Sequence, residues 1–250
     1  MDALFQFLLR QGDNALVLGH RVSEWCGHAP VLEEDIALAN TALDLIGQTQ
    51  MWLGLAGEVE GKGRSADDLA FLRDVWEFRN LLLVERPNDD FGHTMMRQFL
   101  FDAFNLTHLK ALEDSADARI AAIAEKAGKE AAYHLERSRN TVVALGDGTE
   151  ESHARMQAAL EALWPYVGEF FENDSISDEL AAAGIAPEPA SLRAPWEAQV
   201  LPALAEATLE VPDSDFAQLG GKTGVMHTEH LGHLLSQMQW LQRAYPGATW

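Results

Sequence analysis

The sequence predicts an all-α protein built from a bundle of long helices, and three observations support this fold class. Ala, Leu, Glu and Gln recur throughout the 250 residues, whereas Val and Ile, which favour strands, are comparatively sparse. Apolar residues recur at helical spacing in long segments, and Pro-, Gly- and Asp-rich turns separate these segments. The hydrophobic fraction of 47% is enough for a sizeable core at this length.

In the first third of the chain we expect two long helices and one short helix. The first runs over about 2–25, and Pro30 is suited to begin a second that continues to about residue 55. Ser65 predicts the cap of a shorter helix that ends near Trp76. The apolar run 81–84 is too short to assign by periodicity. One face of the second helix is apolar, as packing on a core requires, and it consists of Leu32, Ile36, Ala39, Leu43 and Ile46.

The rest of the chain predicts further helices joined by turns. We expect them at 91–113, at 118–145, from a cap at Ser152 to 171 with a kink at Pro165, at 179–183, from Pro195 through Thr208, and at 227–244. The helices that begin near Pro30, Phe91, Ala118 and His227 each exceed 16 residues. Long helices that alternate with tight turns favour an antiparallel bundle. No repeat period supports the alternative, a helical solenoid, so residues 1–250 are predicted to form a single domain with flanking helices.

Charge and cysteine content narrow the function class. The formal net charge of −21 argues against nucleic-acid binding, which requires clustered Lys and Arg. The acidic surface either keeps the protein soluble or meets a basic partner. Cys26 is the single cysteine, the N-terminus lacks the basic flank of a signal peptide, and no apolar stretch approaches membrane-spanning length. These observations predict a cytoplasmic protein with no membrane segment.

Several ionisable residues occur among the apolar residues of the long helices. Asp44 lies within Leu43–Ile46, and Asp102 shares a helix face with Met95 and Phe99. Glu130 and His134 are one turn apart, and His227, Glu229 and His230 begin the last predicted helix. Because unpaired carboxylates are costly in a core, we expect these side chains to face one another.

This pattern is similar to the metal centre of ferritin-like di-iron bundles, but ligands are missing. Such a centre takes one carboxylate from each of two helices and a Glu-x-x-His pair from each of the other two. Asp44 and Glu130 can supply the lone carboxylates, whereas Asp102 is followed three residues later by Asn105 and Glu229 by Gly232. We therefore favour a ferritin-like bundle with a buried polar network of Asp44, Asp102, Glu130 and His134. A single metal at His134, His230 and one carboxylate remains open.

Other candidate motifs are weak. Glu150-x-x-His153 matches the pair literally, but it lies at a boundary between a loop and a helix. The segment 220–223 is similar to the end of a phosphate-binding loop, yet Phe216 occupies the position of the first glycine.

At the level of whole segments, the chain resembles a known family. The segments 18–30, 38–48, 80–85, 220–222 and 227–232, together with Trp250, resemble the C subunit of ring-1,2-phenylacetyl-CoA epoxidase. The similarity covers essentially the whole chain. It implies a bacterial multicomponent monooxygenase of aerobic phenylacetate degradation, in which a di-iron A subunit performs the oxygen chemistry and a reductase delivers electrons from NADPH.

The resemblance also implies what this chain does within such a complex. The C subunit has a ferritin-like fold with an incomplete metal site, binds no cofactor of its own and supports the A subunit. Asn105 occupies a position where His is common in the family. The C subunit also borders the acyl-CoA site of the A subunit, and the matching residues here are Glu77, Phe78, Arg79, Asn80, Asp178, Glu179 and Leu180.

We therefore expect a noncatalytic structural subunit of the epoxidase, which associates with the A subunit and the other components. A homodimer of the isolated chain is a further possibility that the sequence leaves open, and Trp52, Trp76 and Trp240 are candidate interface anchors. The alternative is an autonomous metal-dependent oxidoreductase with an atypical site made of Asp44, Asp102, Glu130, His134 and His230. The missing Glu-x-x-His pairs favour the structural subunit.

Overall fold

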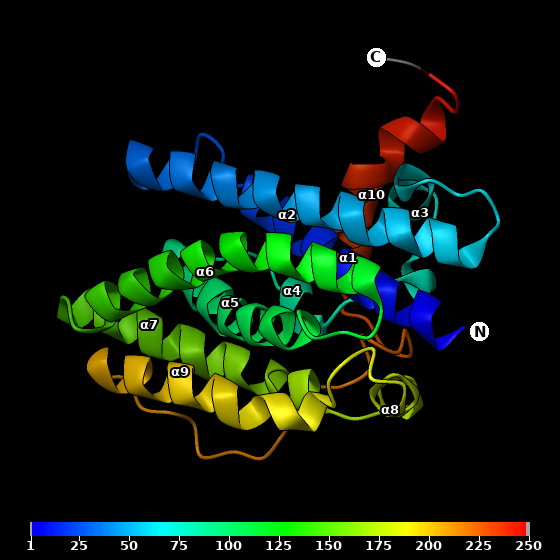
Figure 1. Ribbon diagram of the computed structural model, residues 1–250. Helices are drawn as coiled ribbons and strands as arrows, with labels where there is room; N and C mark the ends of the chain where they lie inside the picture. The colour runs from blue at the N-terminus through cyan, green and yellow to red at the C-terminus, as the bar shows by residue number, and fades with distance from the viewer. Residues whose placement is uncertain (1, 249–250) are drawn as a thin grey trace. The chain divides into compact units, whose positions relative to one another are not determined.

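The computed structural model describes residues 2–248, so Trp250, one element of the resemblance, lies outside the described residues. Within 2–248 all regular secondary structure is helical, which confirms the prediction of an all-α, ferritin-like fold (Figure 1). The chain forms two compact units, which we describe separately. Unit 1 contains the residues up to Pro87 and those from Leu219, and unit 2 contains Asn88–Gln218. That residues 1–250 form a single domain, as the sequence analysis expected, stays a prediction.

Unit 1 is built on the long helices α1 and α2, which pack along each other. Its elements are α1 (Ala3–Ser23), α2 (Leu32–Glu60), α3 (Ala66–Phe71), the 3₁₀-helix η1 (Val75–Glu77), α4 (Leu82–Glu85) and α10 (Glu229–Ala244). Glycines in α1 allow the two long helices to approach closely. A Cβ atom at Gly12 would lie 2.4 Å from Leu53 Cδ2, and one at Gly19 would lie 3.3 Å from Leu45 Cβ.

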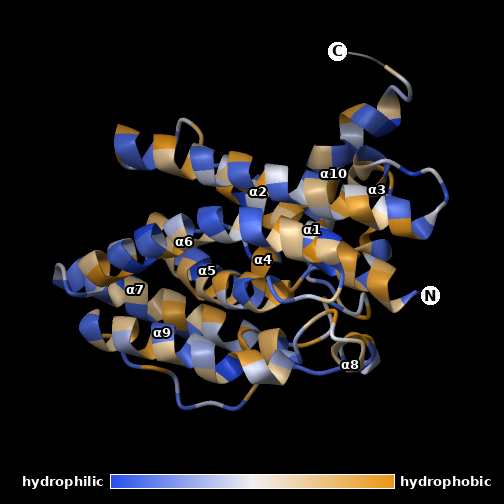
Figure 2. Cartoon of the chain, viewed as in Figure 1, coloured by the Kyte–Doolittle hydropathy of each residue, from blue (hydrophilic) through white to orange (hydrophobic). Residues whose placement is uncertain are grey.

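The apolar face predicted to bury α2 is the wrong one. Leu32, Ile36, Leu43 and Ile46 are 72%, 53%, 66% and 41% exposed. The face that packs on the unit instead contains Leu38, Leu45 and Trp52. Both sets recur at helical spacing, so periodicity alone cannot tell which one meets the core. Figure 2 shows hydrophobic residues recurring along the whole of α2.

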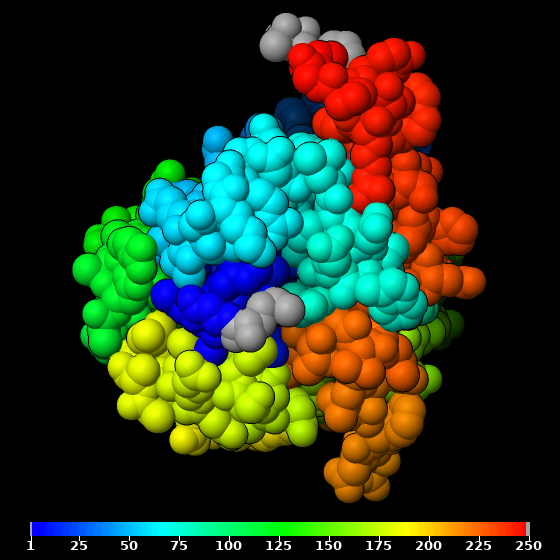
Figure 3. All heavy atoms as spheres, turned by 90° about the vertical axis from the view of Figure 1, so that its right-hand side faces the viewer, coloured from blue at the N-terminus to red at the C-terminus, as the bar shows by residue number. Residues whose placement is uncertain are grey.

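The C-terminal helix α10 packs against α3 and η1, which lie far away from it in the sequence. Figure 3 shows the red C-terminal atoms beside cyan atoms of the first third of the chain. The Gln239 side-chain amide donates to the carbonyls of Ala70 and Arg73, each at 3.0 Å. The helix expected to run through Trp76 ends at Phe71, because Asp74 caps a separate 3₁₀ turn. Likewise α10 begins at Glu229 and not at His227, since Thr228 has the extended backbone of an N-cap.

Unit 2 surrounds α5. Its elements are α5 (Phe91–Leu112), α6 (Ala118–Gly146), α7 (Glu150–Leu163), the 3₁₀-helices η2 (Trp164–Tyr166) and η3 (Gly168–Phe171), α8 (Ser175–Ala182), η4 (Pro189–Leu192) and α9 (Arg193–Glu206). Helix α5 packs against α6, α7 and α9. Aromatic side chains fill one end of its core: Phe104 stacks on Phe170 with ring centroids 4.6 Å apart, and the indole N–H of Trp196 donates to Leu100 O at 3.1 Å.

Two boundaries in unit 2 differ from the prediction for identifiable reasons. Thr149, and not Ser152, caps α7, because the two residues form a reciprocal capping box with Ser152 at the third helical position. Pro165 ends the α-helix at Leu163 and does not merely kink it, and 3₁₀ turns follow. A proline has no backbone N–H to continue the helical ladder. None of the helices in residues 2–248 is long and apolar enough to cross a membrane.

Candidate functional site

Helices α5 and α6 of unit 2 bring together Asp102, His134 and Ser138. All three side chains are buried, and Ser138 forms a hydrogen bond with the Asp102 carboxylate. Asp102 lies on the face of α5 that meets α6. His134 and Ser138 are four residues apart on α6 and therefore occupy the same face of that helix.

The buried position decides the protonation of Asp102. Burial raises the pKa of this carboxyl from 3.8 to about 6, although the charge of His134 and the hydrogen bond from Ser138 favour the ionised form. The loss of hydration is thus the larger effect. The cluster holds a carboxyl group near the midpoint of its titration at mildly acidic pH.

Two arginines complete the electrostatic environment of Asp102. The guanidinium groups of Arg137 and Arg97 also stabilise the ionised carboxylate, and Arg97 donates to Asn88 Oδ1 at 2.7 Å. A di-iron centre needs several carboxylates whose negative charge offsets the metal ions. The groups that act most strongly on the Asp102 carboxyl in unit 2 are instead a histidine, a serine and two arginines, and an arginine is not a ligand of the kind that a di-iron centre uses.

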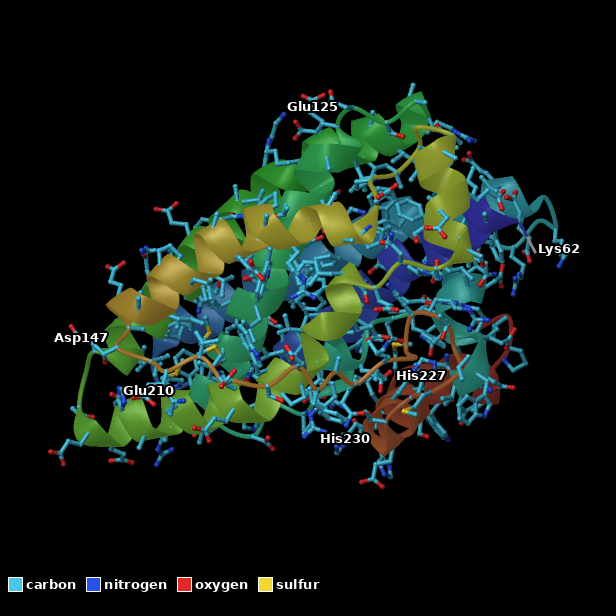
Figure 4. All side chains as sticks on the ribbon, turned by 90° about the horizontal axis from the view of Figure 1, so that it is seen from below. Lys62, Glu125, Asp147, Glu210, His227 and His230 are labelled. Atoms are coloured by element: carbon cyan, nitrogen blue, oxygen red, sulfur yellow. The ribbon has the colours of Figure 1, made fainter. Side chains whose placement is uncertain are left out.

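The other residues predicted for the polar network are less buried than Asp102 and His134. In unit 2, Asn105 on α5 and Glu130 on α6 are half-buried. In unit 1, Asp44 is half-buried on α2, whereas Glu229 is exposed and His230 half-buried in the first turn of α10. Figure 4 marks His230 at the beginning of this helix. A network that joins Asp44 to Asp102 spans both units and stays a prediction, and so does metal binding. Over residues 2–248, no three His, Cys, Asp or Glu side chains gather as a candidate metal site.

A second polar cluster, in unit 1, was not predicted. The fully buried Glu85 carboxylate of α4 accepts hydrogen bonds from Asn80 Nδ2 at 2.9 Å, His227 Nδ1 at 2.6 Å, and both the backbone N–H and the hydroxyl of Thr228 at 2.7 Å. His227 Nε2 lies 3.3 Å from Phe78 O. Glu85 therefore ties the segment before α10 to the segment before α4. The sequence signal was an acidic residue at the end of the apolar run 81–84.

A buried ion pair between α1 and the segment that joins α3 to η1 was also not predicted from the sequence. Arg73 Nη1 donates to Asp13 Oδ2 at 2.9 Å, and Arg73 Nη2 contacts the other carboxylate oxygen. The two side chains are 2% and 0% exposed. The backbone N–H of Arg79 donates to Asp13 Oδ2 at 2.8 Å, so the pair also positions the chain that follows η1.

The residues predicted to border an acyl-CoA site lie in two environments. Glu77 and Arg79 line a pocket of 570 Å³ in unit 1, together with Lys62 and Arg64. Phe78 and Asn80 are fully buried beside it. In unit 2, Asp178 and Glu179 are exposed on α8, whereas Leu180 is buried. Their contact with substrate stays a prediction.

Replacing Asp102 by asparagine is expected to stabilise the isolated chain at neutral pH. Since the folded pKa of about 6 lies above the ordinary 3.8, the folded state binds the proton more tightly than the unfolded state. The stabilisation from the protonated carboxyl is complete below pH 3.8 and is lost as the pH rises through about 6. The loss amounts to about 3 kcal/mol.

Urea unfolding of both proteins between pH 4 and pH 8 measures this difference. The variant should gain little near pH 4 and most above pH 7. Glu136→Gln, at an exposed position of the same α6, is the control and should follow the unmodified chain. Parallel pH profiles for Asp102→Asn and the unmodified chain would show that the carboxyl is not desolvated.

Comparison with known proteins adds to this geometry. A sequence model of the family described as phenylacetic acid catabolic protein matches residues 1–250. The chain is also similar to the C subunit of the 1,2-phenylacetyl-CoA epoxidase of Escherichia coli (strain K12). The two are 49% identical over 250 residues, which cover the whole of both chains.

Proposed function

Because the chain belongs to the phenylacetic acid catabolic protein family, we propose that it is the noncatalytic structural subunit of a 1,2-phenylacetyl-CoA epoxidase. In this role it acts in aerobic phenylacetate catabolism in the cytoplasm and supports a homologous di-iron A subunit. Iron belongs to that partner, and a reductase component uses NADPH. This chain binds no cofactor of its own.

The environment of Asp102 is the observation that carries the noncatalytic role. At the place where α5 and α6 would contribute metal ligands, a histidine, a serine and two arginines act on the charge of Asp102. The arginines supply positive charge where a catalytic bundle would hold metal ions, and a guanidinium does not give up its charge at physiological pH. The cluster joins α5 to α6 through the contact of Asp102 with Ser138.

In the proposed role, the chain also forms part of the border of the substrate site of the A subunit. The pocket of unit 1 beside Glu77 and Arg79 carries four basic residues, Lys62, Arg64, Arg73 and Arg79. Three of these are engaged by carboxylates within the unit: Lys62 and Arg64 by Glu60, and Arg73 by Asp13. In the complex, the segment from Glu77 to Asn80 borders phenylacetyl-CoA that is bound by the partner.

Activity measurements on the separate and combined subunits test the proposal. The isolated chain, loaded anaerobically with Fe(II), should retain substoichiometric iron and should not epoxidise phenylacetyl-CoA with reductase and NADPH. Adding the A subunit should give a stable complex in size-exclusion chromatography, with turnover once the remaining components are present. The Asp102→Asn variant should form the same complex with unchanged turnover per assembled complex.

Two results would contradict this role. Turnover by the iron-loaded chain without the A subunit would make it an autonomous oxidoreductase. Loss of turnover in the Asp102→Asn complex, with assembly and iron content of the A subunit intact, would give Asp102 a part in the chemistry.

A further inference from the structure

The outward face of α2 carries more apolar surface than a solvated helix needs. Four large aliphatic side chains on this face are more than 40% exposed: Leu32, Ile36, Leu43 and Ile46. The opposite face of the same helix packs on α1 through other residues, Leu38 and Leu45 among them. The core of unit 1 therefore does not account for the outward face. Contiguous exposed apolar surface of this kind marks interaction sites.

The spacing of these residues is that of a helix-packing seam. Together with Ala39 and Gln50 they follow steps of four and three residues, at positions 32, 36, 39, 43, 46 and 50. This is the a/d pattern by which one helix packs along another. We call these six residues the outer seam. At 1.5 Å per residue the seam is about 27 Å long, which matches a partner helix of about five turns.

Two glycines on the same side of α2 provide independent support. A Cβ atom at Gly47 or Gly54 would meet nothing within 4 Å, so the fold of this chain does not require glycine at either position. Glycine inside a helix is less stable than alanine there. Gly47 follows Leu43 by four residues, and Gly54 follows Gln50 by four, so both adjoin the outer seam. Small residues at such positions let the backbone of a second helix approach closely.

The charges on α2 indicate the chemistry of the partner. Over Leu32–Glu60 the helix contains no Lys or Arg, and its acidic residues are Glu33, Glu34, Asp35, Asp44, Glu58 and Glu60. A second copy of this chain, with the same acidic helix and a net charge of −21, would place like charges along the contact. An anionic membrane surface would be repelled for the same reason.

We propose that the outer seam binds an amphipathic helix of another subunit, with apolar a and d residues facing the seam and Lys and Arg at the flanking positions. This inference rests on the proposed role as a structural subunit and names the surface that performs it. The apolar residues provide the affinity. The acidic residues around them select a basic helix and disfavour self-association.

Gly47→Leu is the sharpest variant, because the two effects that it should have are opposite in sign. The isolated chain should melt a few degrees higher, since leucine is a better helix former and its side chain meets no neighbour. Binding of the A subunit, measured by biolayer interferometry or by co-purification, should weaken at least tenfold, because leucine blocks the close approach. Leu43→Glu should weaken binding similarly without lowering the melting temperature, since Leu43 is mostly exposed.

Val225→Glu is the matched control: this residue is 78% exposed in unit 1 and belongs to the segment before α10, not to α2, and the variant should bind like the unmodified chain. Binding should also weaken with rising salt, because the flanking ion pairs are exposed. If seam variants bind the A subunit like the unmodified chain, the seam inference is wrong and the proposed function stands. If the unmodified chain binds no subunit of the epoxidase, the proposed function itself is wrong. If the isolated chain forms a dimer that Leu43→Glu dissociates, the occupant is a second copy, which overturns the inference of a basic partner.

Discussion

Exchanging Asp13 for asparagine is expected to lower the free energy of unfolding by about 3–5 kcal/mol, the usual cost of breaking a buried ion pair from one side. The exchange leaves the Arg73 guanidinium, which is 2% exposed, without its charged partner. Arg73 also lies over the Phe78 ring, 4.3 Å from its centroid. The backbone N–H of Arg79 loses a charged acceptor as well.

Urea unfolding followed by circular dichroism measures this loss. Glu125→Gln is the control, because Glu125 pairs with Lys129 on α6 where both side chains are more than 70% exposed, and its removal should leave the midpoint nearly unchanged. The double variant Asp13→Asn/Arg73→Met should recover part of the lost stability, since no buried charge is then unpaired. An unchanged midpoint for Asp13→Asn alone would mean that water reaches Arg73.

Removing the Glu85 carboxylate should have an effect of similar size, about 3–5 kcal/mol, and should loosen a defined part of unit 1. Glu85→Ala leaves four donors in a buried site without an acceptor: those of Asn80 and His227, and two from Thr228. Even glutamine cannot replace the carboxylate fully, because its amide nitrogen would face donors in either orientation.

Hydrogen exchange provides the measurement with positional detail. Amides in the first turns of α10 and in residues 78–85 should exchange faster in Glu85→Ala, whereas those of α5 and α6 in unit 2 should change least. Thr228→Val removes only the hydroxyl donor, so we expect a smaller loss of about 1 kcal/mol and nearly normal protection. Protection of α10 in Glu85→Ala equal to that of the unmodified chain would show that other contacts hold this helix.

The helices that the sequence predicts accurately are those with a recognisable start signal and a recognisable stop signal. Helix α5 was expected over 91–113 and covers Phe91–Leu112, because Asp90 caps its start and a polar turn follows its last apolar residue. The start of α10 was misplaced because His227, which looks like a helix residue in the sequence, is bound by the Glu85 carboxylate in a non-helical segment. That contact joins residues 142 positions apart, and no local pattern reports it.

The candidate site also depends on contacts between residues far apart in the sequence, which local patterns do not report. Asp102 and His134 could be named because each interrupts an apolar pattern, and the structure places both in one cluster. Ser138 and Arg137 could not, since serine and arginine on a helix are ordinary surface residues until the facing helix is known. The prediction of which face of α2 is buried was wrong for a related reason. Helix α2 has two apolar stripes, and the sequence does not mark which of them packs within the chain.

The order of the two units along the chain has a consequence for biosynthesis. Unit 1 is interrupted: α1 to α4 are made first, α10 is made last, and the whole of unit 2, Asn88–Gln218, is made between them. Ribosomes add about 5–20 residues per second, so the N-terminal helices wait roughly 7–26 s for the segment that completes them. Unit 2 is contiguous and can fold on the ribosome during this interval. Unit 2 can therefore complete its fold before unit 1 does. The surfaces of α3 and η1 that α10 covers are exposed to chaperones and proteases until synthesis is almost complete.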